Sequence, residues 1–413
     1  MKYLHAAITL AFAANSQAAI NYNHADTDTT LSLSGFLNGG YHLNKGDNVD
    51  WDNVSAQQKA QRNLDSILNS PSASEADKEI AREEFNKIKQ NNPYWKEKDT
   101  SVDDSYLRLT IALNQKINDE LQAFAIYERD FHTSDNDEDD VRDAYVGITS
   151  NYGSIRVGRD ENSLTYVRDT LYTPEEKTGY ERHSFFEPLT ISGRNDNSII
   201  YDFNNERFGI EAGYIIGQEE DYEKQSGYAL SAKVNVSNFI FSAGYAYGKK
   251  ELDKKGVYNQ PDLTSYGYSP FSISEVFYGF TDNLNYKHEE KQFNLGIAYK
   301  ADFFDAAFVY TKSKNDLDAK GENVDGYSGS NNLSYDLDGF QTYIAKQFGD
   351  KYRISLNYSY LENKNEKYNI TDAVTVEGKY FFIRDSFIYL NVGLDKSDAS
   401  DIYLINSGIR LSF

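Results

Sequence analysis

The chain has 413 residues, no cysteine and a formal net charge of −22. The absence of cysteine excludes disulfides and thiolate metal sites, and the acidic balance argues against nucleic acid as a partner, because phosphate binding requires a basic surface. Hydrophobic residues make up 39% of the chain, too few for a membrane protein built from helices, and beyond the N-terminus no apolar run is long enough for a transmembrane helix.

The N-terminus has the three parts of a secretory signal peptide. Lys2 supplies a positive charge, Leu4 to Ala14 form an apolar core, and Ser16-Gln17-Ala18 provides small residues for cleavage. We therefore expect residues 1–18 to be removed on export and the mature chain to span residues 19–413. The alternative is a buried N-terminal helix.

From Thr30 onward, apolar and polar side chains alternate with a period of two residues. Residues 31–43 place leucines on one face and Ser, Asn and His on the other, and residues 106–116, 293–300 and 352–360 repeat the pattern. Because successive residues of a strand point to opposite faces, these segments predict a sheet with one apolar and one polar side.

Residues 46–101 interrupt this pattern and predict a helical insertion between the first two strands. A helix is expected to start after Ser74, and Ile80, Phe85 and Ile88 then fall on one of its faces. One interpretation is a solvated or rim-packed helical hairpin. The other is a cap over the central opening or a latch to a neighbouring subunit.

The connections between strands are alternately short and long. Asn, Asp, Ser and Gly form the short ones and suit tight hairpins, whereas polar stretches such as 251–289 and 315–331 form long loops. Counting hairpins gives about 16 strands, with short turns on one rim and long loops on the other, which is typical of a transmembrane β-barrel.

A soluble β-sandwich would also show alternation, but its strands would seldom sustain it for the roughly ten residues that a bilayer requires. Tyrosine and phenylalanine gather near the strand ends, where amphipathic rings suit a membrane interface. A closed barrel also satisfies every backbone group in lipid. We therefore predict an all-β, 16-stranded antiparallel transmembrane β-barrel with the helical insertion in its first outer loop.

A long segment, residues 161–196, separates two of the predicted strands, and loops of this length tend to be functional. It mixes aromatic and charged side chains rather than linker residues. We predict that this third outer loop folds into the mouth of the barrel and sets the width of a channel. Tyr166, Tyr172 and Tyr180 within it are candidates for stacking on a solute.

Several segments carry a family resemblance. They are SYLRLTIALNQKINDELQAFAIYERDF, AYVGITSNYGSIRVGRD and GRNDNSIIYDFNNERFGIEAGY, together with the pair Pro174-Glu175 and the terminal Phe413, which closes an alternating strand. In this order they resemble the Gram-negative general-diffusion porins over nearly all of the mature chain. The resemblance implies a homotrimer of 16-stranded barrels, an inward-folded third loop, and a terminal aromatic that the outer-membrane assembly machinery reads.

The resemblance also assigns roles at the predicted constriction. Arg108 resembles the wall arginine of the second strand, Arg159 the arginine that ends the fifth, and Arg194 the arginine at the base of the sixth. Glu175 resembles the loop glutamate after proline. Alternation directs Arg108 and Arg156 inward, whereas the role of Arg159 depends on the resemblance. The complete predicted set is Arg108, Arg129, Arg156, Arg159, Arg194, Asp169, Glu175 and Glu176.

Three features differ from the family pattern. Gly35 is followed by Phe36, where the family often has a lysine. The run Pro174-Glu175-Glu176-Lys177-Thr178 replaces PEFGG, and no aspartate precedes it at the expected position. The helical insertion has no counterpart.

The predicted function is passive diffusion of ions and small hydrophilic solutes through a water-filled outer-membrane channel, without a cofactor or a bound metal. Wall arginines that face loop carboxylates would orient polar solutes, and acidic outer loops predict weak cation selectivity. Expected partners are outer-membrane lipid, lipopolysaccharide, the barrel-assembly machinery and further copies of the chain.

The main alternative is a substrate-selective channel, for oligosaccharides for example, in which the loop tyrosines stack on the solute. A structural or adhesion barrel would instead have a plugged lumen. An enzyme is not expected, because the six histidines are not spaced as metal ligands and no Ser–His pairing recurs on neighbouring strands. The fold alone does not exclude catalysis.

Overall fold

The computed structural model describes most of the chain. The described ranges are 20–24, 28–49, 73–91, 95–103, 105–133, 140–161, 164–168, 194–220, 223–253, 282–322, 328–365, 367–383, 385–398 and 400–413, with residues 57, 60, 64, 67, 68, 70 and 170. The predicted signal peptide and most of the predicted constriction loop lie outside these residues.

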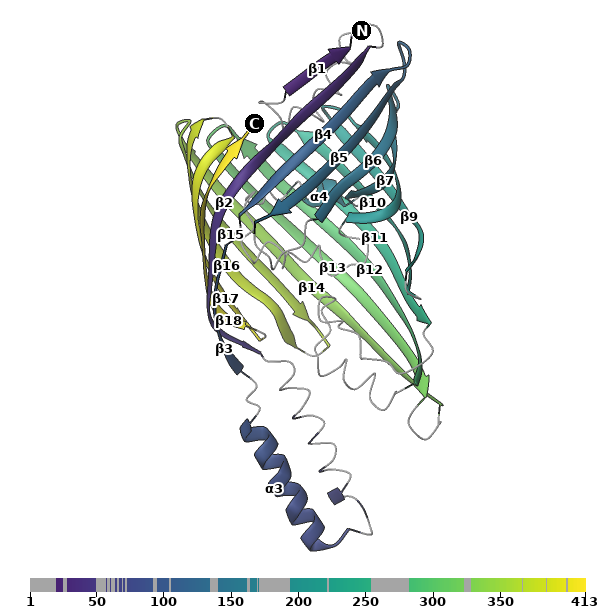
Figure 1. The fold of residues 1–413 in the computed structure, drawn as a ribbon, viewed down its shortest axis with the longest axis vertical. Helices are drawn as coiled ribbons and strands as arrows, with labels where there is room; N and C mark the ends of the chain where they lie inside the picture. The colour runs from purple at the N-terminus through teal and green to yellow at the C-terminus, as the bar shows by residue number, and fades with distance from the viewer. Residues whose placement is uncertain are drawn as a thin grey trace.

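The described strands form one antiparallel sheet that closes into a barrel (Figure 1). Of its 18 strands, two are additions to the edges of β2, and the other 16 make the ring. The ring closes where β18 pairs with β2, and Gly35 and Phe413 exchange backbone hydrogen bonds of 3.0 and 2.9 Å at this seam. The predicted 16-stranded barrel is therefore confirmed. The ring consists of β2 (Thr29–Val49), β4 (Tyr106–Lys116), β5 (Gln122–His132), β6 (Asp140–Ser150), β7 (Gly153–Glu161), β8 (Arg194–Asn204), β9 (Phe208–Glu220), β10 (Glu223–Val236), β11 (Phe239–Asp253), β12 (Asp282–Ala301), β13 (Phe304–Glu322), β14 (Ser328–Phe348), β15 (Tyr352–Asn363), β16 (Tyr368–Ile383), β17 (Ser386–Ser397) and β18 (Ser400–Ser412).

The two additional strands lengthen the edges of β2. Strand β1 (Ile20–His24) pairs with the start of β2, on the edge that β18 occupies further along. Strand β3 (Trp95–Asp103) pairs with the end of β2 and continues the line of β4. Both edges of β2 are therefore hydrogen-bonded along most of the strand, one by β1 and β18 and the other by β4 and β3.

The period of two sorts side chains by face, as expected for pleated strands. On β14, Tyr343 is 1% exposed on the inner face and the next residue, Ile344, is 44% exposed on the outer face. The outer row is apolar around the ring, whereas the inner row is largely polar and well buried. Inner-row residues of β12–β17 that are at most 6% exposed include Gln292, Asn294, Thr311, Ser313, Asn315, Gln341, Asn357 and Asn391, with the apolar Val309, Leu317 and Leu337 among them.

The barrel wall differs in height around the ring. Strands β5 to β8 have 9 to 11 residues each, whereas β12 to β14 have 19 to 21. Figure 1 shows the long strands reaching past the rest of the wall at the rim opposite the chain termini. That rim carries the long connections, and the short turns lie at the rim near the C-terminus.

Helix α3 (Glu75–Asn91) falls within the predicted insertion and stands away from the rim (Figure 1). Its N-terminus is capped reciprocally: the backbone N–H of Asp77 donates to the Ser74 hydroxyl at 3.2 Å, and the Asp77 carboxylate accepts from the Ser74 N–H at 2.9 Å. Hydrogen bonds from Ser74 lower the pKa of Asp77. Ala81 is buried on one face of α3, and no helix among the described residues is long and apolar enough to span a membrane. Buried helical residues before α3 recur at intervals of three and four, at Gln57, Ala60 and Leu64.

Candidate functional site

An ion-paired cluster follows the barrel wall from β4 to β9. Four arginines and six carboxylates take part, and their side chains are between 2% and 26% exposed. We call this group the charged cluster. It consists of Arg108, Glu128, Asp130, Arg142, Asp143, Arg156, Asp160, Glu161, Arg194 and Glu211.

Arg108 on β4 and Asp130 on β5 are opposite one another and form a bidentate pair. The Nε and Nη2 atoms of Arg108 donate to the two carboxylate oxygens at 2.7 and 2.8 Å, a geometry that is both directional and strong. Glu128 lies two residues before Asp130 and shares its face. Its carboxylate is 3.8 Å from Nε of Arg108 and accepts from Thr110 at 2.8 Å.

A β-bulge brings Arg142 of β6 to the same group. The register of β5 with β6 shifts at Glu128 and leaves Arg142 without an opposite partner, and bulges of this kind re-aim a side chain. Arg142 donates from Nε to Glu128 at 3.0 Å and from Nη1 to Asp130 at 3.4 Å. Strict alternation from the outward-facing Val146 would have directed Arg142 outward.

Arg156 on β7 holds two further carboxylates. It donates to Asp160 on its own strand and, at 3.0 Å, to Glu211 on β9. Between Arg156 and Asp160, Gly158 has a φ of 141°, a conformation that glycine adopts without the strain of a side chain. The register of β7 with β8 shifts at the same place, so this irregularity shapes the outer end of β7.

Arg194 begins β8 and forms a third set of ion pairs between the other two. It donates to Asp143 on β6 at 2.8 Å and lies 3.6 Å from Glu161 at the end of β7. The cluster therefore consists of three neighbouring sets of ion pairs on adjacent strands. Each arginine is already matched by wall carboxylates, and the carboxylates outnumber the arginines.

Phe36 lies on the inner face of β2, next to the charged cluster. Its ring centroid is 5.0 Å from the guanidinium carbon of Arg108 and 4.0 Å from that of Arg410. Such cation–π contacts stabilise the charged groups and restrain their planes. Phe36 stands where the family pattern often has a lysine. It adds no charge there and instead contacts two arginines that are already present.

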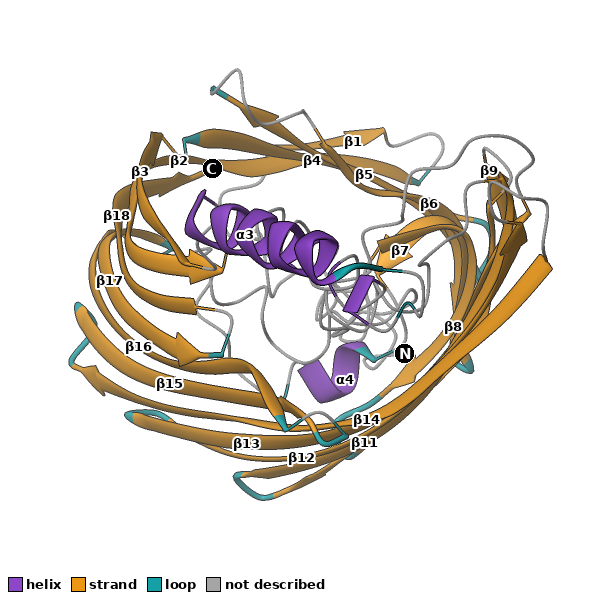
Figure 2. Ribbon diagram, turned by 90° about the horizontal axis from the view of Figure 1, so that it is seen from below, coloured by secondary structure: helices purple, strands orange, loops and turns teal. Residues whose placement is uncertain are grey.

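Helix α4 (Thr165–Arg168) lies inside the barrel against β9 to β12 (Figure 2). The Tyr166 hydroxyl donates to Asp202, the Tyr166 ring lies 4.3 Å from Nζ of Lys233, and Thr170 is hydrogen-bonded to Ser242 at 2.6 Å. Wall glycines leave the space that this turn occupies. A Cβ would lie 2.8 Å from Tyr166 at Gly209, 2.7 Å from Leu164 at Gly244, and 3.1 Å from Thr170 at Gly296.

The structure brings some of the predicted constriction residues together and leaves others apart. Those in the charged cluster are Arg108, Arg156 and Arg194. Arg159 lies to one side, 3.1 Å from Asp196 and bonded to a backbone carbonyl. Arg129 belongs to the outward-facing row of β5, where its guanidinium lies 5.2 Å from the ring of Phe131. Outside the described residues lie Asp169, Glu175, Glu176, Tyr172 and Tyr180.

Two other predicted residues have defined surroundings. Tyr166 is 5% exposed and packed against the wall, so its ring offers no free face to a solute. Phe413 ends the chain beside β2, where the absence of a side chain at Gly35 makes room for its ring. Among the described residues, no group of three or more His, Asp or Glu side chains is placed to hold a metal ion.

Arg142 and every wall carboxylate of the charged cluster were not predicted from the sequence. Glu128 and Asp130 could have been predicted. Alternation places both on one face of their strand, and the neighbouring strand carries the inward-facing Arg108. Arg142 could not be predicted, because a bulge of one residue has no distinctive sequence signal. Which carboxylate pairs with each arginine could therefore not be predicted, because it depends on the register of neighbouring strands.

Comparisons with known proteins agree on one family. The sequence model of the Gram-negative porins matches residues 5–400. Porin-like protein L of Photobacterium profundum is 22% identical over 75% of this chain and 82% of its own length. Outer membrane protein U of Vibrio parahaemolyticus is 24% identical over 60% of this chain and 77% of its own length.

Solved structures show the same fold. OmpF of Salmonella typhi, in a complex with daunomycin, superposes with a TM-score of 0.61 at 12% identity, over 95% of this chain and all of that one. A loop L8 deletion mutant of OmpT of Vibrio cholerae superposes with a TM-score of 0.59 at 16% identity, over 93% of this chain and 99% of that one.

Proposed function

The chain belongs to the Gram-negative porins, and from that premise we propose that its outer-membrane diffusion channel passes cations in modest preference to anions. The observation that carries the proposal is the composition of the charged cluster, in which six carboxylates face four arginines along the wall. A wall of this kind presents a small negative excess to the lumen. Charged rings in pores select ions of the opposite sign.

The total charge of the chain acts in the same direction. A net charge of −22 concentrates cations near the protein and lowers the local concentration of anions. The arginines do not oppose this field as free charges, because each has a carboxylate within 3.1 Å. The wall arginines therefore contribute less to the predicted electric field between them and the loop carboxylates.

We further propose that the segment around α4 narrows this channel. This segment packs inside the barrel against Gly209, Gly244 and Gly296. The first part of the third outer loop therefore lies within the barrel and does not project outward. The retained expectation is that Glu175 and Glu176 further along this loop face the lumen. Substrate selectivity through stacking gains no support from Tyr166, whose ring is buried against the wall.

Assembly and export also belong to the proposal. The OmpT structure of Vibrio cholerae includes a trimer form, and we propose the same state for this chain. Residues 1–18 are proposed to direct export, Phe413 to be recognised by the assembly machinery, and the outer surface to contact lipid and lipopolysaccharide. Chemical cross-linking in native outer membranes tests the trimer directly: a ladder that stops at the dimer would contradict it.

The experiment for selectivity is the reversal potential of the purified protein in a planar bilayer under a tenfold KCl gradient. We expect a potential of the sign that K⁺ permeation produces, without block by oligosaccharides. A zero or anion-directed potential would contradict cation preference, and tight block by one sugar would favour a substrate-selective channel. An absence of any conductance would indicate a plugged barrel.

A further inference from the structure

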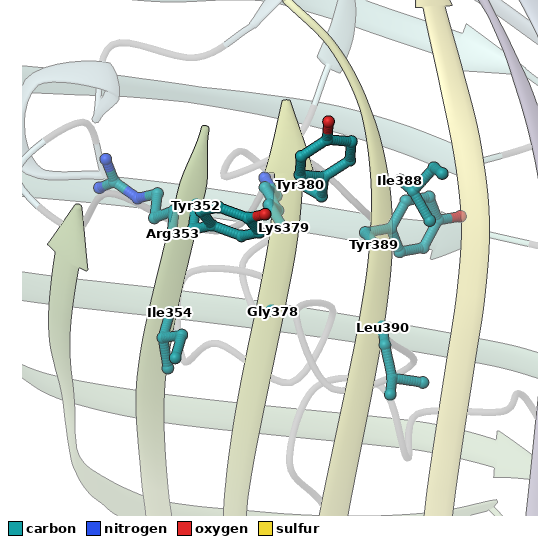
Figure 3. A pocket seen from close by; sticks show the side chains of 9 residues that line it. All are labelled: Tyr352, Arg353, Ile354, Gly378, Lys379, Tyr380, Ile388, Tyr389 and Leu390. Atoms are coloured by element: carbon teal, nitrogen blue, oxygen red, sulfur yellow. The ribbon is translucent and has the colours of Figure 1, made fainter. Parts of the chain in front are cut away.

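The outer face of β15 to β17 contains a notch centred on Gly378 (Figure 3). Gly378 of β16 stands in register between Ile354 of β15 and Leu390 of β17. A Cβ at this glycine would have no atom within 4 Å, so the space is open. Its volume is about 320 Å³, about ten times the share of one water molecule in the liquid. The side toward the short turns is closed by Tyr352, Tyr380 and Ile388.

The walls of the notch are apolar and outward-facing. Ile354, Leu390 and Tyr352 are 52%, 51% and 54% exposed, and the rings of Tyr352 and Tyr380 lie 5.2 Å apart along one side. Water is held in a cavity by two to four polar partners, and a site without them suits hydrocarbon. Because the outer row of a membrane barrel contacts lipid, an acyl chain is the group that this notch fits.

A cation stands beside the notch. Lys346 of β14 lies in register with Ile354, two strand spacings or about 10 Å from Gly378. It is exposed on the outer row, with Nζ 5.1 Å from the ring centroid of Phe348. Within the part of the chain that the structure describes, no carboxylate pairs with Lys346. A lipid-facing lysine is costly near the bilayer centre and is tolerated near the interface, where it reaches a headgroup.

We propose that the notch and Lys346 form a binding site for an anionic phospholipid of the periplasmic leaflet. One acyl chain fills the space over Gly378, and the phosphate group is held by the Lys346 ammonium. The leaflet follows from position, because Phe348 and Tyr352 flank a short turn, and short turns of such barrels lie on the periplasmic side. The site is separate from the lumen, so it does not depend on ion selectivity.

Native mass spectrometry of the folded barrel tests this site, after incubation with micelles containing equal amounts of phosphatidylglycerol and phosphatidylethanolamine. The wild-type protein is expected to retain phosphatidylglycerol preferentially. Lys346→Gln should reduce that preference about fivefold, because a lysine near an anionic lipid surface contributes about a factor of five in binding. Gly378→Leu should reduce retention of both lipids about tenfold or more, because its side chain excludes several methylene groups.

Matched controls separate the site from general effects. Gly39→Leu adds the same side chain at a glycine of the lipid-facing row of β2, where a Cβ has only an ordinary contact of 3.7 Å. Lys312→Gln removes an exposed lysine from the outer row of β13. Neither control should change lipid retention, and all variants should keep wild-type conductance, which shows that they are folded.

Three results would overturn the proposal. The first is lipid retention by Gly378→Leu equal to that of the wild type, and the second is an unchanged phosphatidylglycerol preference in Lys346→Gln. The third is a change in oligomeric mass on filling the notch without a change in bound lipid, which would assign the surface to a contact between copies of the chain.

Discussion

Glu128→Gln is the substitution that most directly tests the electrostatics of the channel wall. The Glu128 side chain is 17% exposed, pairs with Arg142 at 3.0 Å and accepts a hydrogen bond from Thr110. Glutamine keeps its shape and one acceptor oxygen while removing one negative charge. The charged cluster would then contain four arginines and five carboxylates, and the preference for cations should fall.

The size of this effect follows from Coulomb's law. At about 7 Å from an ion in the lumen, one charge contributes about 0.6 kcal/mol in water, and screening in 0.1 M salt reduces this to about 0.3 kcal/mol. The change acts with opposite sign on K⁺ and Cl⁻, so their permeability ratio should shift by about 0.6 kcal/mol, or about threefold. In 1 M salt the screening length is about 3 Å, and the shift should fall to about 1.2-fold.

The assay is the reversal potential in planar bilayers, measured across KCl gradients centred near 0.1 M and near 1 M. Glu79→Gln is the matched control, because it changes the net charge by the same amount on helix α3, outside the barrel. It should leave the permeability ratio unchanged. Equal shifts for Glu128→Gln and Glu79→Gln, or a shift that persists at high salt, would refute the assignment of selectivity to the wall.

Three further predictions concern stability and loop position. Asp130→Asn should destabilise the barrel toward urea by about 3–5 kcal/mol, because it leaves Arg108 without its buried partner. Gly244→Ala should lower single-channel conductance, because the new Cβ would lie 2.7 Å from Leu164 and move the α4 segment toward the lumen. Ser74→Ala should weaken helix α3 above pH 3.8 and have a smaller effect in acid: the pKa of Asp77 is lowered from its ordinary value of 3.8 in the folded helix, so the capping contribution is present above pH 3.8 and is lost as the pH falls through the folded value. Hydrogen exchange of α3 should therefore lose its acid-dependent step in this variant.

The first two of these changes each have a control substitution elsewhere in the chain. Asp119→Asn breaks an exposed ion pair with Lys116 and should have no measurable effect on urea unfolding. Gly39→Ala adds a methyl group on the outer row and should leave conductance unchanged. Equal destabilisation by the two aspartate substitutions, a conductance effect of Gly39→Ala, or retained pH dependence in Ser74→Ala would each contradict the corresponding reasoning.

The fold could be predicted from the sequence because the bilayer imposes a simple rule on every strand. Leu107, Leu109 and Ile111 alternate with Arg108 and Thr110, and the same rule applies around the ring, so strand number and face followed from the pattern. The start of α3 could also be predicted, because Ser74 is a local capping signal. The division of the wall into short and long strands was not predicted, because strand ends depend on pairing between segments distant in sequence.

The site was predictable only where alternation continued without interruption. Arg108 and Arg156 were assigned to the inner face by parity and lie in the charged cluster. Parity fails at Arg142, because the bulge inserts one residue into β6. The resemblance indicated which arginines to consider but not that their counter-ions come from neighbouring strands, since that information resides in the register.

The unequal wall decides how the molecule meets its surroundings. At about 3.3 Å per residue and a tilt of about 40°, the 21 residues of β14 rise about 53 Å, whereas the apolar band of such a barrel is about 25 Å tall. Strand β5, with 11 residues, rises about 28 Å, which is close to the height of that apolar band. One side of the barrel wall therefore stands about 25 Å higher than the other. A solute that enters over the lower side of the wall therefore meets the charged cluster first.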